Sequence, residues 1–244
     1  MPFIKPLLVT TIALASLSAI AYATVNRGEA SNSALPLAAQ SGDLPDLRVE
    51  YRRWSIGADG ARQELTYTEH LIRDRDQLWI EREIPEAARV HHDGHAHGGL
   101  GHKHDDVVGA PLWVRRDAQG VLDVELIDRE EQRLIRTEEP NYGNVGFVGR
   151  WDESYHLLNP ADLGKLTPVG DARDGVQRYE IQRGTTTIRV SWDIAGHYAR
   201  EITSEDSRGL SGRTIRASVL NTPAQLPWTL VAGYAQRDYS DLLD

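Results

Sequence analysis

Residues 111–127 read Pro-Leu-Trp-Val-Arg-Arg-Asp-Ala-Gln-Gly-Val-Leu-Asp-Val-Glu-Leu-Ile, and this stretch decides the fold class. Apolar and polar residues alternate on both sides of Asp117-Ala-Gln-Gly120, as they do when successive side chains point to opposite faces of a strand. Glycine at the end of that turn tolerates the positive φ that tight turns require. The stretch therefore predicts a β-hairpin.

The same alternation recurs along most of the chain. It is found at residues 47–51, 65–73, 78–84, 176–181, 187–192, 198–202 and 213–219. Gly57-Ala-Asp-Gly60, Gly184-Thr185 and Ser207-Arg-Gly209 supply further turn signals. Strands separated by turn signals every ~8–12 residues are typical of a mainly β, antiparallel fold.

One segment, residues 148–166, departs from the strand pattern. Trp151, Tyr155 and Leu158 recur at helical spacing, and Asn159-Pro160 is expected to end the helix. We therefore expect one short mid-chain helix that divides the strands into two groups.

This layout of strands and helix resembles that of the periplasmic lipoprotein-carrier family. The resemblance implies a curved antiparallel sheet, a half-barrel that wraps around a short helical plug, and a cavity for an apolar ligand. It covers the body of the chain and rests on strand spacing, with no motif matched residue by residue. A β-sandwich is the alternative fold.

The N-terminal segment indicates secretion. Leu7–Ile20 is an apolar run, and Ala21-Tyr22-Ala23 fits the small-x-small pattern of signal peptidase. We expect residues 1–23 to be a signal peptide cut after Ala23, which leaves a periplasmic protein without a stable membrane anchor. The run is shorter than the ~20 apolar residues of a spanning helix. Residues 24–46 are expected to be a flexible linker, and residues 47–244 a single antiparallel β domain.

Composition narrows the chemistry. The net charge of −9 disfavours nucleic acid as a partner, because phosphate binding relies on Lys and Arg. The chain has no cysteine, and Met1 is its only methionine. Any metal site must therefore use imidazole and carboxylate, which suit Zn(II), and also Ni(II) or Cu(II).

A histidine-rich loop between two predicted strands, at about residues 85–110, carries the clearest chemical signal. Six of the nine histidines fall in residues 91–106 together with glycines and aspartates. Glycine lets the backbone wrap around an ion, and connections longer than ~15 residues are uncommon unless they are functional or disordered. The predicted metal ligands are His91, His92, His95, His97, His102, His104, Asp93, Asp105 and Asp106. The composition is similar to that of the His-rich loops of periplasmic zinc-uptake proteins.

These observations predict a periplasmic protein that captures, buffers or delivers Zn(II) or a similar divalent ion, with an envelope metal transporter as a further partner. Two alternatives stay open: a non-enzymatic carrier for a lipid or other apolar ligand, and an envelope protein-interaction module. A hollow sheet favours the carrier, whereas a tightly filled core disfavours it.

Other candidate sites have simpler interpretations. The chain contains neither a His-Glu-x-x-His zinc helix nor a Gly-x-Ser-x-Gly nucleophile turn, so we expect no enzyme. His70, His156 and His197 are interpreted as structural. The six tryptophans are expected to pack an ordinary core rather than line a cavity.

Overall fold

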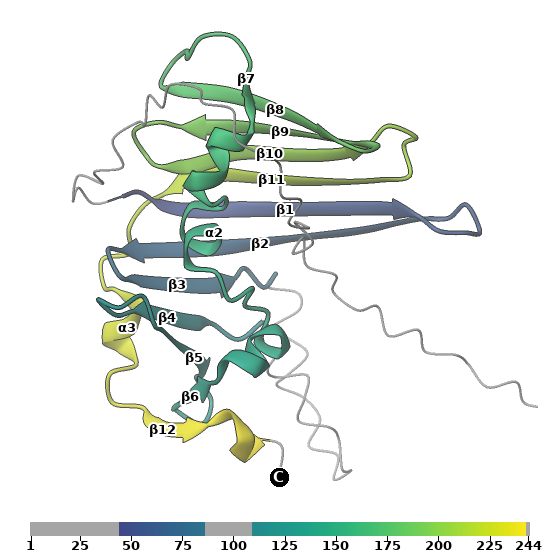
Figure 1. Ribbon diagram of the computed structural model, residues 1–244. Coiled ribbons are helices and arrows are strands. Elements are labelled where there is room, and N and C mark those ends of the chain that lie inside the picture. Colours follow the sequence, from purple (N-terminus) through teal and green to yellow (C-terminus); the bar gives the residue numbers. More distant parts are fainter. Residues whose placement is uncertain (1–43, 86–108, 243–244) are drawn as a thin grey trace, which may run out of the picture. The chain divides into compact units, whose positions relative to one another are not determined.

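The computed structural model describes residues 44–85 and 109–242, which form one open, curved sheet of twelve strands (Figure 1). The strand order across the sheet is β12-β6-β5-β4-β3-β2-β1-β11-β10-β9-β8-β7, and every neighbouring pair is antiparallel except the parallel pair β12 and β6. The mainly β, antiparallel prediction is confirmed. Because all described strands belong to one sheet, the β-sandwich alternative is wrong.

The elements follow one another in two groups of strands. The first group is β1 (Asp46–Ile56), β2 (Arg62–Asp74), β3 (Gln77–Arg82), β4 (Leu112–Arg116), β5 (Leu122–Asp128) and β6 (Arg133–Thr137). Three short helices follow: η1 (Glu139–Val145), α2 (Trp151–His156) and η2 (Pro160–Lys165). The second group is β7 (Thr167–Pro168), β8 (Val176–Arg183), β9 (Thr186–Asp193), β10 (Tyr198–Asp206) and β11 (Ser211–Leu220). The chain continues through α3 (Pro227–Leu230), β12 (Ala235–Asp238) and η3 (Tyr239–Leu242).

The predicted hairpin is present as β4 and β5. Val114 lies opposite Val124, and Gly120 takes the positive φ of 84° that the turn needs. The Asp117 carboxylate accepts hydrogen bonds from the main-chain N–H groups of Gln119 and Val121, at 2.9 Å and 2.8 Å. The side chain of Asp117 therefore fixes the turn that joins these strands.

The predicted mid-chain helix is present as α2 and divides the strands as expected. It ends earlier than Asn159-Pro160, because Leu157 already adopts a left-handed conformation with φ of 65°. The Asn159 side chain instead caps the next helix by accepting a hydrogen bond from the Ala161 N–H at 3.0 Å. This Asn-Pro pair begins a helix, since proline suits the first helical position.

The sheet has two unlike faces. We call the face on which α2 packs the inner face; it carries the main core, where Leu47, Val49 and Leu71 meet Tyr155. The opposite, outer face is covered near α3 by a smaller cluster that includes Trp79, Trp228 and Val231. The core therefore lies on both faces of the first group of strands, and a third cluster, around Val190 and Trp192 on β9, lies in the second group.

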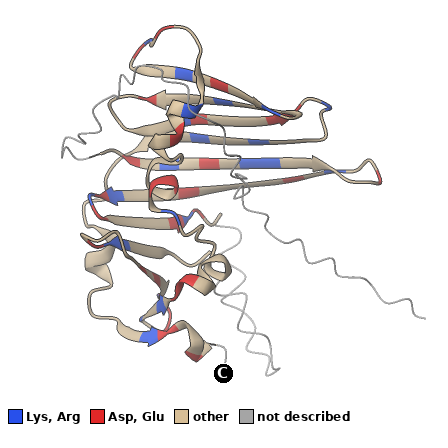
Figure 2. Ribbon diagram, viewed as in Figure 1, with Lys and Arg blue, Asp and Glu red and all other residues tan. Residues whose placement is uncertain are grey.

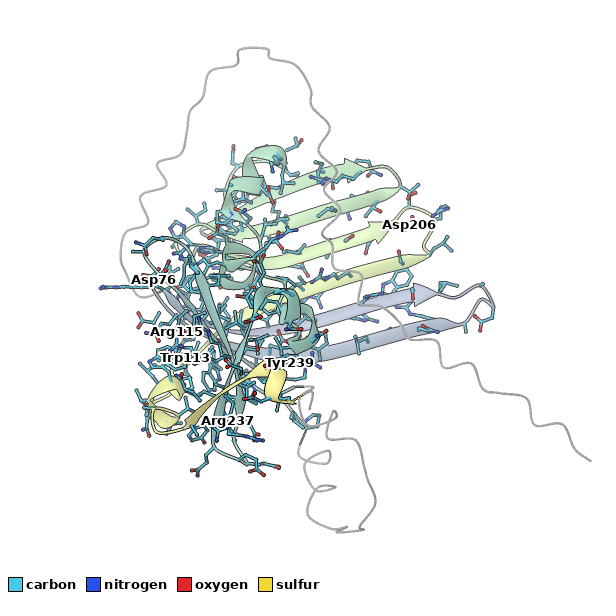
Figure 3. All side chains as sticks on the ribbon, turned by 60° about the horizontal axis from the view of Figure 1, so that its bottom comes forward. Asp76, Trp113, Arg115, Asp206, Arg237 and Tyr239 are labelled. Atoms are coloured by element: carbon cyan, nitrogen blue, oxygen red, sulfur yellow. The ribbon has the colours of Figure 1, made fainter. Side chains whose placement is uncertain are left out.

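The longer strands extend beyond this core. In Figure 1 the described helices lie over one end of the sheet, and the right-hand ends of β1, β2 and β8–β11 continue past them. Figure 2 shows basic and acidic segments following one another along these strands. Asp206, labelled in Figure 3, marks the far end of β10.

Candidate functional site

The predicted metal ligands fall outside the described residues. All nine of them belong to residues 86–108, as the signal peptide and most of the linker belong to residues 1–43. Within residues 44–85 and 109–242, no group of three or more His, Asp or Glu side chains is arranged to hold a metal ion. Zinc binding by the loop therefore stays a prediction.

The other three histidines do not form one site in the described part of the chain. His70 lies on β2 with its Nε2 3.5 Å from an Oε2 of Glu83. His156 is at the end of α2, where its Nδ1 lies 2.5 Å from the carbonyl oxygen of His197. Burial is the main cause that lowers the pKa of His156, so the neutral ring with a proton on Nδ1 donates this bond. The contact holds α2 to the turn before β10.

The attachment points of the loop are adjacent strands. β3 ends at Arg82 and β4 begins at Leu112, and Ile80 lies directly opposite Leu112. Neighbouring antiparallel strands need only a connection of ~2–5 residues. The fold therefore does not require the long segment between β3 and β4.

A hollow of about 440 Å³ lies where that segment leaves and rejoins the sheet. It is lined by Thr66, Tyr67, Thr68, Arg82, Glu83, Ile84, Pro85 and Gly109. The Arg82 guanidinium sits 4.1 Å from the centre of the Tyr67 ring, as in a cation–π contact. The hollow is open and partly polar, so by itself it does not define an apolar cavity.

A polar cluster lies on the inner face next to this hollow. The rings of Tyr51 and Tyr67 stack at 4.7 Å, and Glu69 is 3.6 Å from Arg82. Burial, as the largest cause, raises the pKa of Glu69 and raises that of Tyr51 well above its usual range. The Arg82 Nε is buried and has no hydrogen-bond partner among the described residues. The cluster marks where the filled core gives way to a more accessible inner face.

The register of the long strands defines two rows of residues across that part of the inner face. The row nearer α2 contains Tyr67, Tyr51, Ile215, Ile202, Val190 and Tyr179. The next row outward contains Leu65, Arg53, Arg213, Ser204, Ile188 and Ile181. Ile181, Ile188 and Ile202 are only half-buried, and Leu65 is 57% exposed. We call these two rows together the apolar shelf.

Two arginines interrupt the shelf. Arg53 on β1 lies directly opposite Arg213 on β11, and neither has an acidic side chain within 4.0 Å among the described residues. Like charges directly opposite each other destabilise a sheet. Sequence reasoning did not identify this pair, because the pairing of β1 with β11 joins opposite ends of the body.

The outer face of the same strands has the reverse character. There, arginines are matched with glutamates on neighbouring strands: Arg52 with Glu64 at 2.6 Å, Arg216 with Glu201 at 2.7 Å and Arg189 with Glu180 at 2.7 Å. Charge is thus neutralised on the outer face and left unmatched at the centre of the apolar shelf.

The tryptophans pack rather than line a cavity, as expected. Trp151 stacks on Tyr155 at 4.9 Å, Trp192 packs under η2, and Trp79 and Trp228 belong to the outer-face cluster. In Figure 3, Trp113 and Arg115 lie side by side, with the guanidinium 4.0 Å from the indole centre. Trp54 lies on the outer face against Gly212 and under Arg62.

Comparisons with known proteins match neither a family model nor a curated protein. Similar solved structures include a putative outer membrane lipoprotein-sorting protein domain from Vibrio parahaemolyticus, with 12% identity over 77% of this chain and 89% of that one and a TM-score of 0.33. A LolA superfamily protein from Nitrosomonas europaea has 12% identity over 78% and 90% of the two chains, with a TM-score of 0.31. A DUF1329 family protein from Desulfovibrio piger has 13% identity over 82% and 92%, with a TM-score of 0.33.

Two of these structures carry the name of the lipoprotein-sorting or LolA class that the strand layout resembles. Identity and TM-score are both too low for a function to be carried over from them. None of the helices in residues 44–85 and 109–242 has the length and apolar character of a membrane span. The fold and the shelf define the class of the protein. It is a β protein with one open sheet, and the described helices cover only part of the inner face of that sheet.

Proposed function

We propose that this chain is a non-enzymatic binding protein of the bacterial envelope, and that it holds the apolar part of a ligand on the apolar shelf. The observation that carries the proposal is the contrast between the two faces of the long strands. Outer-face side chains form ion pairs, whereas Ile188, Ile202 and Ile181 on the inner face are only half-buried. Covering apolar surface is favourable by ~25 cal/mol per Å², so a ligand that covers the shelf gains binding free energy.

The filled half of the inner face limits where the ligand lies. Leu47 and Val49 on β1 and Tyr155 on α2 belong to one core cluster and are almost fully buried, which leaves the ligand the region beyond them. A hollow sheet is expected to favour the carrier and a filled core to disfavour it; the inner face beneath α2 is filled, so the carrier proposed here is restricted to the shelf beyond that part. The signal peptide that the sequence predicts at residues 1–23 would place this function in the periplasm.

A substitution pair on one strand tests the shelf. Ile188 faces the inner side of β9 and its neighbour Thr187 faces the outer side. Ile188→Lys places a charge on the shelf, and Thr187→Lys places the same charge on the opposite face as a control. With the neutral apolar dye N-phenyl-1-naphthylamine, we expect Ile188→Lys to lose about tenfold or more in affinity and Thr187→Lys to bind as the wild type does.

Thermal unfolding shows whether both variants are folded. If Ile188→Lys does not fold, Ile188→Thr serves instead, because it retains the β-branched shape that suits a strand. Equal dye binding by wild type and a folded Ile188 variant would contradict the shelf as the binding surface.

A second candidate function concerns the loop. The specific observation is that β3 and β4 are neighbours, so residues 86–108 are not needed to complete the sheet. We propose that the six histidines and three aspartates of residues 91–106 capture Zn(II), or Ni(II) or Cu(II), for buffering or delivery to an envelope transporter. Imidazole and carboxylate ligands suit these ions.

A competitive Zn(II) titration of the intact protein beside a variant lacking residues 91–106 tests this function. If the intact protein binds Zn(II) with submicromolar affinity and the shortened variant does not, the result supports metal binding by residues 91–106. Equal binding by both assigns the metal to the rest of the chain, and no binding by either removes the metal function altogether. Dye binding by the same two proteins shows whether the shelf acts independently of the loop.

A further inference from the structure

Arg53 and Arg213 are the unmatched charges at the centre of the shelf. They lie opposite each other on β1 and β11, and Leu65 and Ser204 continue the row on either side. Directly opposed residues of antiparallel strands have Cβ atoms ~4.5–5.5 Å apart. Arginine side chains that leave the sheet this close together can bring both guanidinium groups to a single carboxylate or phosphate and donate hydrogen bonds to it.

The surroundings of Arg53 and Arg213 differ from those of ordinary surface arginines. Tyr51 and Ile215, two residues along each strand toward α2, lie beside the two arginines on the same face. Burial raises the pKa of Tyr51 and of Tyr67, and the positive charge of Arg213 opposes this rise at both rings, so the charge lies close to the apolar part of the shelf. The shelf thus presents cations to one part of a ligand and an apolar surface to the rest.

We propose, resting on the function proposed above, that the ligand of the shelf is an anionic amphiphile whose headgroup binds between Arg53 and Arg213. Its hydrocarbon chain lies along Ile202, Ile188 and Ile181, the half-buried isoleucines of the shelf. The ligand carboxylate or phosphate supplies the counter-charge that the outer-face arginines obtain from glutamates. Binding also relieves the repulsion between the two opposed arginines.

The test compares two ligands that differ only in the headgroup. Dodecanoate and 1-dodecanol carry the same chain, and each is titrated against dye bound to the full chain expressed with its own residues 1–23 and purified from the periplasm. The wild type is expected to bind dodecanoate about tenfold or more tightly than dodecanol. The double variant Arg53→Gln/Arg213→Gln is expected to bind both ligands with the affinity that the wild type has for dodecanol.

The matched control removes two arginines from the outer face of the same strands. Arg52→Gln/Arg216→Gln changes the net charge by the same amount and is expected to keep the wild-type preference for dodecanoate. Equal affinity of the wild type for the two ligands, or a preference that survives in Arg53→Gln/Arg213→Gln, would overturn the inference. If the wild type does not bind dodecanol at all, the proposed function of the shelf as an apolar binding surface is wrong. This result differs from the failure of the headgroup inference, so the two failures are distinguishable.

Two further measurements test whether the arginine pair binds a simple anion or a second copy of the chain instead. Inorganic phosphate and acetate are expected to bind more weakly than dodecanoate by about a hundredfold or more, because they lack the chain. If either binds as tightly, the pair is a simple anion site and the amphiphile is wrong. Sedimentation without ligand is expected to show a monomer; a dimer that Arg53→Gln/Arg213→Gln dissociates would assign the pair to a second copy and overturn the inference.

Discussion

Arg73 donates a hydrogen bond from its Nη1 to the main-chain carbonyl oxygen of Tyr155 at 2.8 Å, and so ties β2 to helix α2. Its Nε donates to the carbonyl oxygen of Pro45 at 2.9 Å, and its main-chain N–H donates to the Asp46 carboxylate at 2.8 Å. The side chain is almost fully buried, and burial lowers the pKa of Arg73 to about 10. One cation therefore joins the sheet, the start of β1 and the helical plug.

Replacing this cation should destabilise the protein strongly. Arg73→Met leaves the carbonyl oxygens of Tyr155 and Pro45 buried without a donor, and each unsatisfied group costs ~1–3 kcal/mol. We expect a loss of about 3 kcal/mol in the free energy of unfolding in urea. The exposed Arg178→Met is the control and should remain within about 0.5 kcal/mol of the wild type. If the two substitutions change the free energy of unfolding equally, Arg73 does not stabilise the packing of α2 on the sheet.

His156 should make stability depend on pH. Its pKa is lowered in the folded state, mainly by burial, with Arg73 and His197 also lowering it and the His197 carbonyl and Asp152 raising it. The unfolded chain therefore binds more protons below the ordinary value of 6.5, so the stabilisation is complete above 6.5 and is lost as pH falls through the lower pKa of the folded state.

The non-titrating variant His156→Gln isolates this dependence. Urea unfolding of both proteins between about pH 7.5 and pH 5 should show the wild type losing its advantage over the variant as pH falls. The histidines of the loop are the same in both proteins and cancel in the difference. Parallel stability curves would show that burial of His156 does not control this pH dependence.

Gly212 should resist substitution because Trp54 occupies the space above it. A Cβ at Gly212 would lie 2.6 Å from the indole Nε1 of Trp54, the residue directly opposite on β1. Gly212→Ala should displace the indole and cost about 1–3 kcal/mol, as overpacking does. Gly164→Ala, which meets no atom within 4 Å, is the control, and we expect its stability to stay near that of the wild type. Adding Trp54→Val to Gly212→Ala should restore much of the loss, whereas an unchanged loss would point to a cause other than this contact.

The segment between β3 and β4 should be dispensable for folding. Because Ile80 pairs with Leu112, a short Gly-Ser connector in place of residues 86–108 should leave the sheet intact. A shorter loop lowers the entropy cost of closure, so stability should be unchanged or higher by up to about 1 kcal/mol. Thermal unfolding and far-ultraviolet circular dichroism measure this. An unfolded product would show that the segment contributes to the folded body.

Much of the fold follows from local sequence. The hairpin at residues 111–127 could be predicted because apolar alternation and turn residues act over a few positions. The helix that begins at Trp151 could be predicted from the spacing of its apolar residues. The end of that helix could not be predicted, because Leu157 adopts a left-handed conformation that is uncommon for leucine. Tertiary packing of Leu157 in the core overrides its local preference.

The candidate site was predictable only in part. Residues 91–106 stand out by composition alone, and their metal binding stays a prediction. Neither Arg53 nor Arg213 stands out, because each follows the ordinary alternation of its own strand. Their opposition becomes visible only when β1 is placed next to β11, a pairing of distant segments that periodicity cannot show.

The position of β1 between β2 and β11 has a consequence for secretion. If the chain crosses the inner membrane from its N-terminus, the hairpin of β1 and β2 emerges early, but the second edge of β1 stays unpaired until Ser211–Leu220 arrives. Unpaired strand edges invite association with other chains, and contacts between distant segments form slowly. In that case the emerging chain carries an open β1 edge until β11 has followed it across the membrane, and shielding of that edge would protect the chain from association with other chains.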